Sequence, residues 1–131
     1  MKYSVSFDED DNFFRVKATG SAVVELIHEM VKSLVEHEQW HVGVNTLLDF
    51  SEVNFSCLDT DEIVQLSNIV KALSEQIGDG QCAMVTNQQV DFGLARMWQM
   101  MTEHHVEFQV EIYNSLTDAV EWLGTQSMVE H

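Results

Sequence analysis

The stretches "LLDF" (47–50) and "CAMV" (82–85) decide the fold, because both are short, mostly apolar runs with little polar alternation. Strands that are buried on both faces of a parallel sheet have this composition. Between them, residues 60–78 repeat apolar side chains at steps of three and four and end at Gly78, a pattern typical of an amphipathic helix. A strand, a helix and a second strand in this order predict two parallel strands joined by a helix.

The rest of the chain continues this alternation of strands and helices. Residues 3–7 and 13–19 are rich in β-branched and aromatic residues, and the polar stretch "DEDDN" (8–12) between them predicts a hairpin. The other expected elements are a helix over 21–40 capped by Ser21, strands over 44–50 and 81–86, a helix over 91–105, a strand over 106–113, and a helix over 115–124 capped by Ser115 and ended by Gly124. The order ββαβαβαβα predicts an α/β fold with a mixed, mainly parallel sheet of about five strands, an N-terminal hairpin and four helices.

Length and composition predict one domain. The chain has 131 residues, 45% of them apolar, which is enough to bury a core. We expect this domain to span 1–124 and a loose tail to follow over 125–131. No apolar run reaches about 18 residues and the first residues lack a signal-peptide pattern, so we expect a cytoplasmic protein. Cys57 and Cys82 are too isolated to indicate a disulfide framework or a zinc ribbon.

The charge excludes one class of partner and disfavours another. The net charge is −16, with six Lys and Arg against 22 Asp and Glu. Nucleic-acid binding requires clustered cations that neutralise phosphates, so we expect no nucleic-acid partner. Association with an anionic membrane surface is disfavoured for the same reason.

The pentapeptide "HEQWH" (37–41) has the spacing of a zinc-protease motif. Such a site needs both His side chains on one face of a helix and a third ligand downstream. Here the helix pattern fades at Trp40, so that His41 falls on a turn, and no third ligand follows at the family spacing. Two His residues near a helix C-terminus, where positive charge is favourable, explain the match better. We therefore expect no catalytic residue, no metal and no cofactor.

Three stretches resemble the SpoIIAA-like (STAS-like) family of small bacterial proteins: "LLDFSEV" (47–53), "CAMVTNQQVDFGLARMW" (82–98) and "VEIYNSLTDAVEWLG" (110–124). In that family an Asp closes a central strand, and the last helix ends in a signature that here reads Ala119, Trp122 and Leu123. The resemblance implies a sheet flanked by helices, related to anti-sigma-factor antagonists and to CRAL-TRIO lipid-transfer domains. It implies no settled activity.

The chain departs from the family at a phosphorylation motif. In anti-sigma-factor antagonists, the strand is followed by Asp-Ser-Ser-Gly at a helix start, and a Ser there is phosphorylated. This chain reads "SCLDTDEI" (56–63) instead, and Thr60 is its nearest hydroxyl. A phosphate on Thr60 would be repelled by the neighbouring carboxylates, so we expect Thr60 to cap a helix and not to act as a switch.

The helix expected over 91–105 carries more apolar side chains than one core-facing stripe needs. Its core face is expected to hold Leu94, Met97, Trp98 and Met101, and its outer face Phe92, Arg96, Gln99 and Glu103, with Met100 on the flank. Met can simply fill gaps in a core. Otherwise the surplus predicts an apolar pocket or groove under this helix, or a patch that meets a partner.

Ligands of open α/β sheets bind at the carboxyl ends of the strands. The expected ligand or partner site therefore comprises Asp49, Ser51, Thr86, Asn87, Phe92, Arg96 and Met100. Our first hypothesis is a non-enzymatic binding or regulatory module for a protein partner or a small apolar ligand. A homodimer is compatible with this hypothesis. The alternative is a lipid or fatty-acid binding domain that associates transiently with membranes. A metal-dependent hydrolase using "HEQWH" is the weakest of the three.

Overall fold

The fold is a five-stranded mixed sheet with the strand order β1-β2-β3-β4-β5. The computed structural model describes residues 1–129, with side chains through Gly124, and residues 130–131 lie outside the described chain. The strands are β1 (Lys2–Asp8), β2 (Phe13–Ser21), β3 (Asn45–Asn54), β4 (Gln81–Val85) and β5 (Gln109–Tyr113). β1 pairs antiparallel with β2, and all later neighbours pair parallel, so the expected mixed α/β sheet is confirmed.

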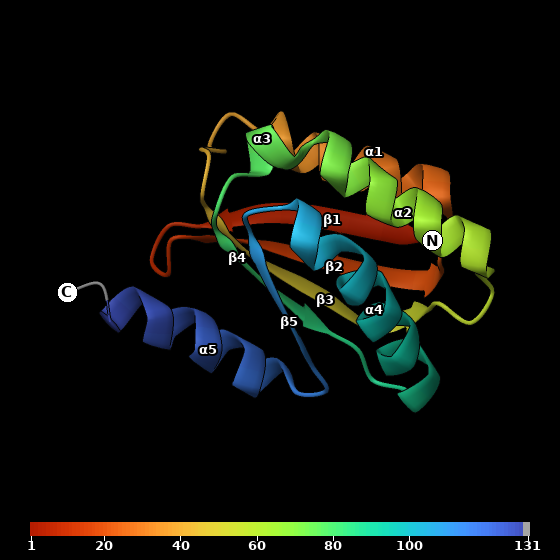
Figure 1. Cartoon of the computed structure of the whole chain (residues 1–131). Helices are drawn as coiled ribbons and strands as arrows, with labels where there is room; N and C mark the ends of the chain where they lie inside the picture. The colour runs from red at the N-terminus through yellow and green to blue at the C-terminus, as the bar shows by residue number, and fades with distance from the viewer. Residues whose placement is uncertain (130–131) are drawn as a thin grey trace.

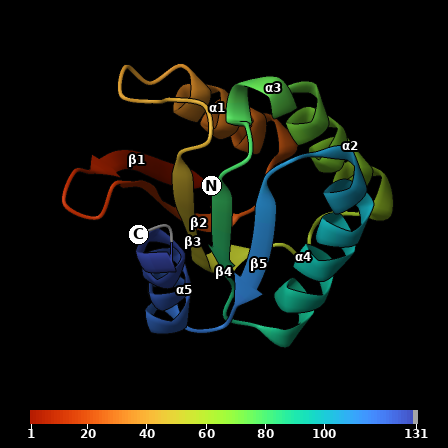
Figure 2. The same cartoon turned by 60° about the vertical axis from the view of Figure 1, so that its left-hand side comes forward.

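Helices cover both faces of the sheet, but unequally (Figures 1 and 2). They are α1 (Val24–Val35), α2 (Thr60–Ala72), α3 (Ser74–Ile77), α4 (Gln89–Thr102) and α5 (Leu116–Val129), with a 3-10 turn η1 (Glu103–His105) after α4. α1 to α4 lie on one face, where α2 packs between α1 and α4, and α5 lies on the other against β3, β4 and β5. None of the helices in the described chain is long and apolar enough to cross a membrane.

Two apolar clusters match this arrangement. The larger lies between the sheet and α1, α2 and α4, and includes Phe14, Met30 and Ile63. The smaller lies under α5 and includes Leu47 and Val85. The central strands β3 and β4 therefore bury side chains on both faces, which is the physical reason for their largely apolar sequences.

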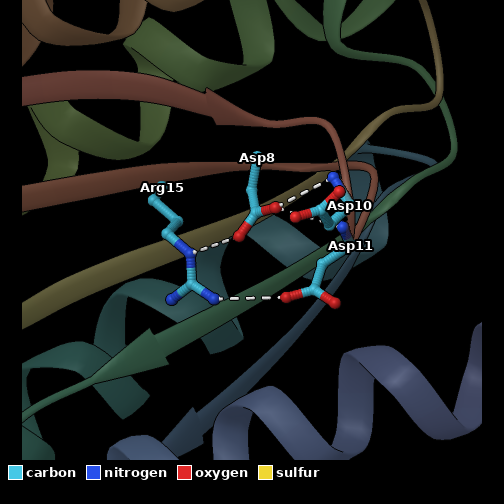
Figure 3. Close-up of polar contacts among 4 residues, drawn as sticks. All are labelled: Asp8, Asp10, Asp11 and Arg15. Atoms are coloured by element: carbon cyan, nitrogen blue, oxygen red, sulfur yellow. Dashed lines mark hydrogen bonds and ion pairs between the residues drawn. The ribbon is translucent and has the colours of Figure 1, made fainter.

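The hairpin turn after β1 is held by one carboxylate (Figure 3). Asp8 Oδ1 accepts hydrogen bonds from the backbone N–H groups of Asp10 and Asp11, both at 3.1 Å, and its Oδ2 accepts from Arg15 Nε at 3.1 Å. The Asp11 N–H and then the Arg15 guanidinium lower the pKa of Asp8 below its ordinary value. "DEDDN" is thus a hairpin turn, as its composition predicted, with Asn12 at a φ of 59°.

The start of α1 differs from the prediction. Ser21 does not cap the helix, because it extends β2 and pairs with Asn54 of β3. Val23 is the N-cap residue and is 37% exposed, whereas Val24 takes the buried position in the first turn. The helix also ends at Val35, earlier than the expected Trp40.

Helix ends account for the other differences. The helix expected over 60–78 is split at Leu73 into α2 and α3, which gives five α-helices where four were expected. α5 does not end at Gly124 but continues to Val129, because a helix interior tolerates a single Gly at a modest cost. The boundary between a domain at 1–124 and a loose tail at 125–131 stays a prediction.

The N-cap of α2 is Asp59, and the expectation for Thr60 was wrong. Asp59 Oδ1 accepts from the Glu62 N–H at 2.8 Å, and Glu62 Oε1 accepts from the Asp59 N–H at 3.1 Å. This reciprocal pair is a capping box, which places Thr60 at the first helical position. The sequence "DTDE" did signal a helix start, but one residue earlier.

Replacing the two neighbours separately distinguishes these roles. Asp59→Ala should lower the free energy of unfolding by about 0.5–2 kcal/mol, because it removes an N-cap acceptor. Thr60→Ala should change it by less than about 0.5 kcal/mol, as at an ordinary exposed position. Urea unfolding followed by circular dichroism measures both. A larger loss for Thr60→Ala than for Asp59→Ala would contradict the assignment.

Candidate functional site

An apolar cavity of about 120 Å³ lies between the sheet and the helices α1, α2 and α4. Both the sheet and the helices that cover this face contribute side chains to its wall. The lining residues include Ile27, Met30 and Leu34 of α1, Leu48 and Phe50 of β3, Ile63, Leu66 and Ile69 of α2, Met84 of β4, and Leu94, Ala95 and Trp98 of α4. A pocket under the 91–105 helix was one of the alternatives that the surplus apolar residues suggested, and this cavity has that position.

Polar groups in the cavity wall are few. Thr46 supplies the one hydroxyl and Cys82 the one thiol among the lining side chains. Burial raises the pKa of the Cys82 thiol to about 12, so the thiol is neutral and a poor nucleophile. Trp40 also lines the cavity, but its Nε1 donates to the Gln76 carbonyl at 2.9 Å and ties the loop after α1 to α3. The wall can therefore offer apolar contact and little else.

Buried polar side chains position α4 over this cavity. Asp91 is 2% exposed, and its Oδ1 accepts from the Phe55 N–H at 2.9 Å, which fixes the start of α4 to the segment after β3. At the other end of the helix, Thr102 Oγ1 lies 2.7 Å from Ser67 Oγ of α2. The Gln99 amide donates to the Val110 carbonyl of β5. The helix is thus held at both ends and to the neighbouring strand.

The expected orientation of α4 was partly wrong. Gln99 was placed on the outer face, but it is 6% exposed and packed inward, because its side chain satisfies a backbone carbonyl of β5. The buried stripe is Asp91, Ala95, Gln99 and Thr102. The apolar side chains expected in the core, Leu94, Met97, Trp98 and Met101, flank that stripe and are half-buried against the larger core.

The predicted site residues do not form one site. Asp49 lies within β3, opposite Val85, which belongs to the apolar cluster under α5. Its Oδ1 accepts from Ser51 Oγ at 2.6 Å, and its Oδ2 pairs with Lys17 Nζ at 3.2 Å. Burial favours a higher pKa for Asp49, but the hydrogen bonds from Ser51 and Lys17 outweigh it, and the pKa lies below its ordinary value. Asp49 and Ser51 therefore belong to a partly exposed cluster of polar contacts with Lys17 of β2.

Three other predicted residues line a second, open hollow at the carboxyl end of β4. Thr86, Asn87 and Phe92 lie there together with Gln88, Gln89 and Asn114. Thr86 is fully buried, its N–H donates to the Tyr113 carbonyl at 2.9 Å, and its Oγ1 has no hydrogen-bond partner in the described chain. Phe92 is 38% exposed at the edge of this hollow.

The last two predicted residues lie farther along α4. Arg96 donates to Gln99 Oε1 at 2.8 Å, and Met100 is 65% exposed. Neither lines the hollow or the cavity.

"HEQWH" is not on a helix, because α1 ends at Val35. His41 lies in the following turn, as expected, and His37 is half-buried with its ring 5.1 Å from that of Phe14. His37 Nδ1 accepts from the Gln39 N–H at 3.1 Å. Within residues 1–129, no group of three or more His, Cys, Asp or Glu is placed to hold a metal ion.

Sequence reasoning suggested a pocket under the 91–105 helix as one alternative, but it missed most of the cavity's wall and the role of Asp91. The cavity depends on apolar residues from helices and strands that are far apart in the chain, each of which matched an ordinary core pattern. Asp91 gave a weak signal, since an acidic residue in the first turn of a helix normally faces solvent and interacts with the helix dipole.

The same fold is known in a solved structure. The crystal structure of an uncharacterized DUF3478-family protein from Shewanella loihica PV-4, described as having a SpoIIAA-like fold, matches this chain with a TM-score of 0.60. The match covers 93% of this chain and 92% of that chain at 14% sequence identity. This chain has a SpoIIAA-like fold. The resemblance seen in the sequence is thereby confirmed at the level of the fold.

The comparisons show nothing finer than the fold. The sequence matches no protein-family model, and no curated protein matches it. The function therefore has to be argued from the geometry of the chain itself.

Proposed function

We propose that this protein is a non-enzymatic binding module that takes up a small apolar ligand in the cavity between the sheet and α1, α2 and α4. The cavity of about 120 Å³ and its apolar wall carry the proposal. The site lies under α4 and not at the carboxyl ends of the strands, where we first placed it.

The cavity is costly if it stays empty. Empty volume in a protein core costs about 24 cal/mol per Å³, so a fully enclosed void of about 120 Å³ would cost roughly 3 kcal/mol, and an opening to solvent lowers this cost. That is a large share of the stability of an ordinary domain, about 5–15 kcal/mol. Ala95 faces the cavity from α4, and a larger apolar residue at that position would reduce the loss. A ligand that fills the volume removes the same cost.

Size limits the class of ligand. A cavity of about 150 Å³ lined by Leu, Ile and Phe stays dry and binds benzene or xenon. Pockets for larger organic ligands measure about 300–1,000 Å³. The present cavity therefore suits one aromatic ring or a short branched hydrocarbon. A long acyl chain would require α2 or α4 to move, so we place the lipid or fatty-acid alternative second.

A stability measurement with benzene tests this proposal. Benzene at ten times its dissociation constant should raise the stability of the wild type by roughly 1.4 kcal/mol, or about 3–6 °C in melting temperature. Ala95→Leu should remove the benzene effect, because the added methyl groups occupy the cavity. Met100→Leu is the matched control on the same helix, since Met100 is exposed and does not line the cavity.

Two outcomes would contradict the ligand proposal. One is a wild type whose melting temperature does not respond to benzene. The other is an Ala95→Leu variant that folds and responds as strongly as the wild type. Ala95→Val is a smaller substitution that keeps the test possible if Leu overpacks the core and unfolds the domain.

A protein partner at the start of α4 is the second candidate function. Val90 and Phe92 are 59% and 38% exposed next to the open hollow at the end of β4. Exposed apolar side chains rimmed by polar ones are typical of partner-binding surfaces. The hollow is bordered by the amides of Asn87, Gln88 and Gln89, which could hydrogen-bond to a partner's backbone.

The variant Phe92→Ser tests the partner surface separately from the cavity. It should change the free energy of unfolding by less than about 0.5 kcal/mol, because Phe92 is not part of either buried cluster. It should weaken association with a partner, measured by capture from lysate, and leave benzene uptake unchanged. Leu94→Ala, by contrast, should cost about 2–5 kcal/mol, because Leu94 packs on the core. An unfolded Phe92→Ser protein, or one with unchanged association, would argue against this surface.

A further inference from the structure

β1 is an edge strand with little of the usual protection against pairing. Its hydrogen-bonded neighbour in the sheet is β2, and its other edge faces away from the sheet. The pairing with β2 runs without a shift from Lys2↔Thr19 to Asp8↔Phe13, so β1 contains no bulge. The chain contains no proline, and the one Lys of β1 stands at its end. Natural edge strands usually carry one or more such devices, and β1 has only the charges at its two ends, Lys2 and Asp8.

The side chains of β1 suit a second copy of the same strand. Lys2, Ser4 and Ser6 are exposed on one face of β1, and Tyr3, Val5 and Phe7 are half-buried on the face toward α1. If two β1 strands pair antiparallel about a two-fold axis at Val5, Ser4 lies opposite Ser6 and Tyr3 opposite Phe7. Lys2 then lies opposite Asp8, so that each end of the pair brings unlike charges together.

The other edge of the sheet does not have this complementarity. β5 (Gln109–Tyr113) has Glu111 at its centre. The equivalent two-fold pairing would place Glu111 opposite Glu111, and like charges directly opposite each other are destabilising. The two edges are therefore not equivalent as surfaces for self-association.

Charge distribution favours the same edge. Residues 1–20 carry three Lys or Arg and four Asp or Glu, a net charge of −1. Residues 21–131 carry three Lys or Arg and 18 Asp or Glu, a net charge of −15. Two copies of so acidic a chain repel each other over most of their surface. The β1–β2 hairpin is less acidic than the rest of the chain taken together, so the repulsion between two copies is weaker there.

We propose that two copies of this chain associate edge to edge through antiparallel pairing of β1 with β1, so that their two five-stranded sheets form one continuous sheet. Such a two-fold interface is closed, because the same edge is used by both copies. The interface leaves the cavity under α4 accessible and does not depend on the proposed ligand.

Charge substitutions at exposed positions of β1 test the pairing register. Ser4→Glu/Ser6→Glu brings four carboxylates together across the axis and should raise the dimer dissociation constant tenfold or more. Ser4→Lys/Ser6→Glu is the matched control, because each Lys then faces a Glu of the other copy. Its dissociation constant should equal or fall below that of the wild type. Sedimentation equilibrium from about 1 μM to 1 mM covers weak and moderate affinities.

Lys2→Glu is an independent test at the exposed end of the strand, where unfolding is not expected, and it should also raise the dissociation constant. Circular dichroism establishes that each variant is folded. A wild type that stays monomeric over the whole concentration range overturns the proposal. This holds even if the strand of another protein is found to pair with this edge. A dimer whose dissociation constant is the same in all of these variants overturns it as well.

Discussion

The structure depends on how α4 is fixed to the rest of the domain. An ordinary amphipathic helix is positioned by close packing of large apolar side chains along its buried stripe. In α4 that stripe is Asp91, Ala95, Gln99 and Thr102. Hydrogen bonds to Phe55, Val110 and Ser67 position the helix, and Ala95 is the one apolar member. Because hydrogen bonds hold the helix, its centre does not have to fill the space above the sheet.

The cavity follows from this arrangement. The large residues of α4, Leu94 and Trp98, line its sides, and the small Ala95 faces it from the helix. Breaking one anchor would leave a buried polar group unsatisfied, at a cost of about 1–3 kcal/mol, and would let the helix shift into the empty volume. The polar anchors and the apolar cavity are in this sense one feature, since the first keeps the second open.

Hydrophobic patterns predicted most of the fold. The runs "LLDF" and "CAMV" indicated the doubly buried strands, and the alternation of strand and helix patterns indicated the mixed sheet, because burial on one or two faces leaves a direct trace in composition. Helix ends were less predictable. Ser21 looked like a cap, but pairing with Asn54 was available to it only in the folded sheet.

The site was predicted less well than the fold, for a physical reason. Gln99 was expected outside because an amide is normally solvated, and only the position of the Val110 carbonyl shows that it is satisfied inside. The cavity leaves little local trace in the sequence, since its wall combines residues from α1, α2, α3, α4 and the two strands β3 and β4. The surplus of apolar side chains on α4 was the one signal that pointed near it.

The most direct test of this account is the position of xenon in crystals of the wild-type protein under xenon pressure. We predict one well-occupied xenon atom between the sheet and α4, in contact with Met84, Ala95 and Trp98, and no xenon at that position in Ala95→Leu. Such a result would show a dry apolar site of the right size under a helix held by its polar anchors. Ordered water in that volume, or side chains that fill it and leave no room for xenon, would contradict the account.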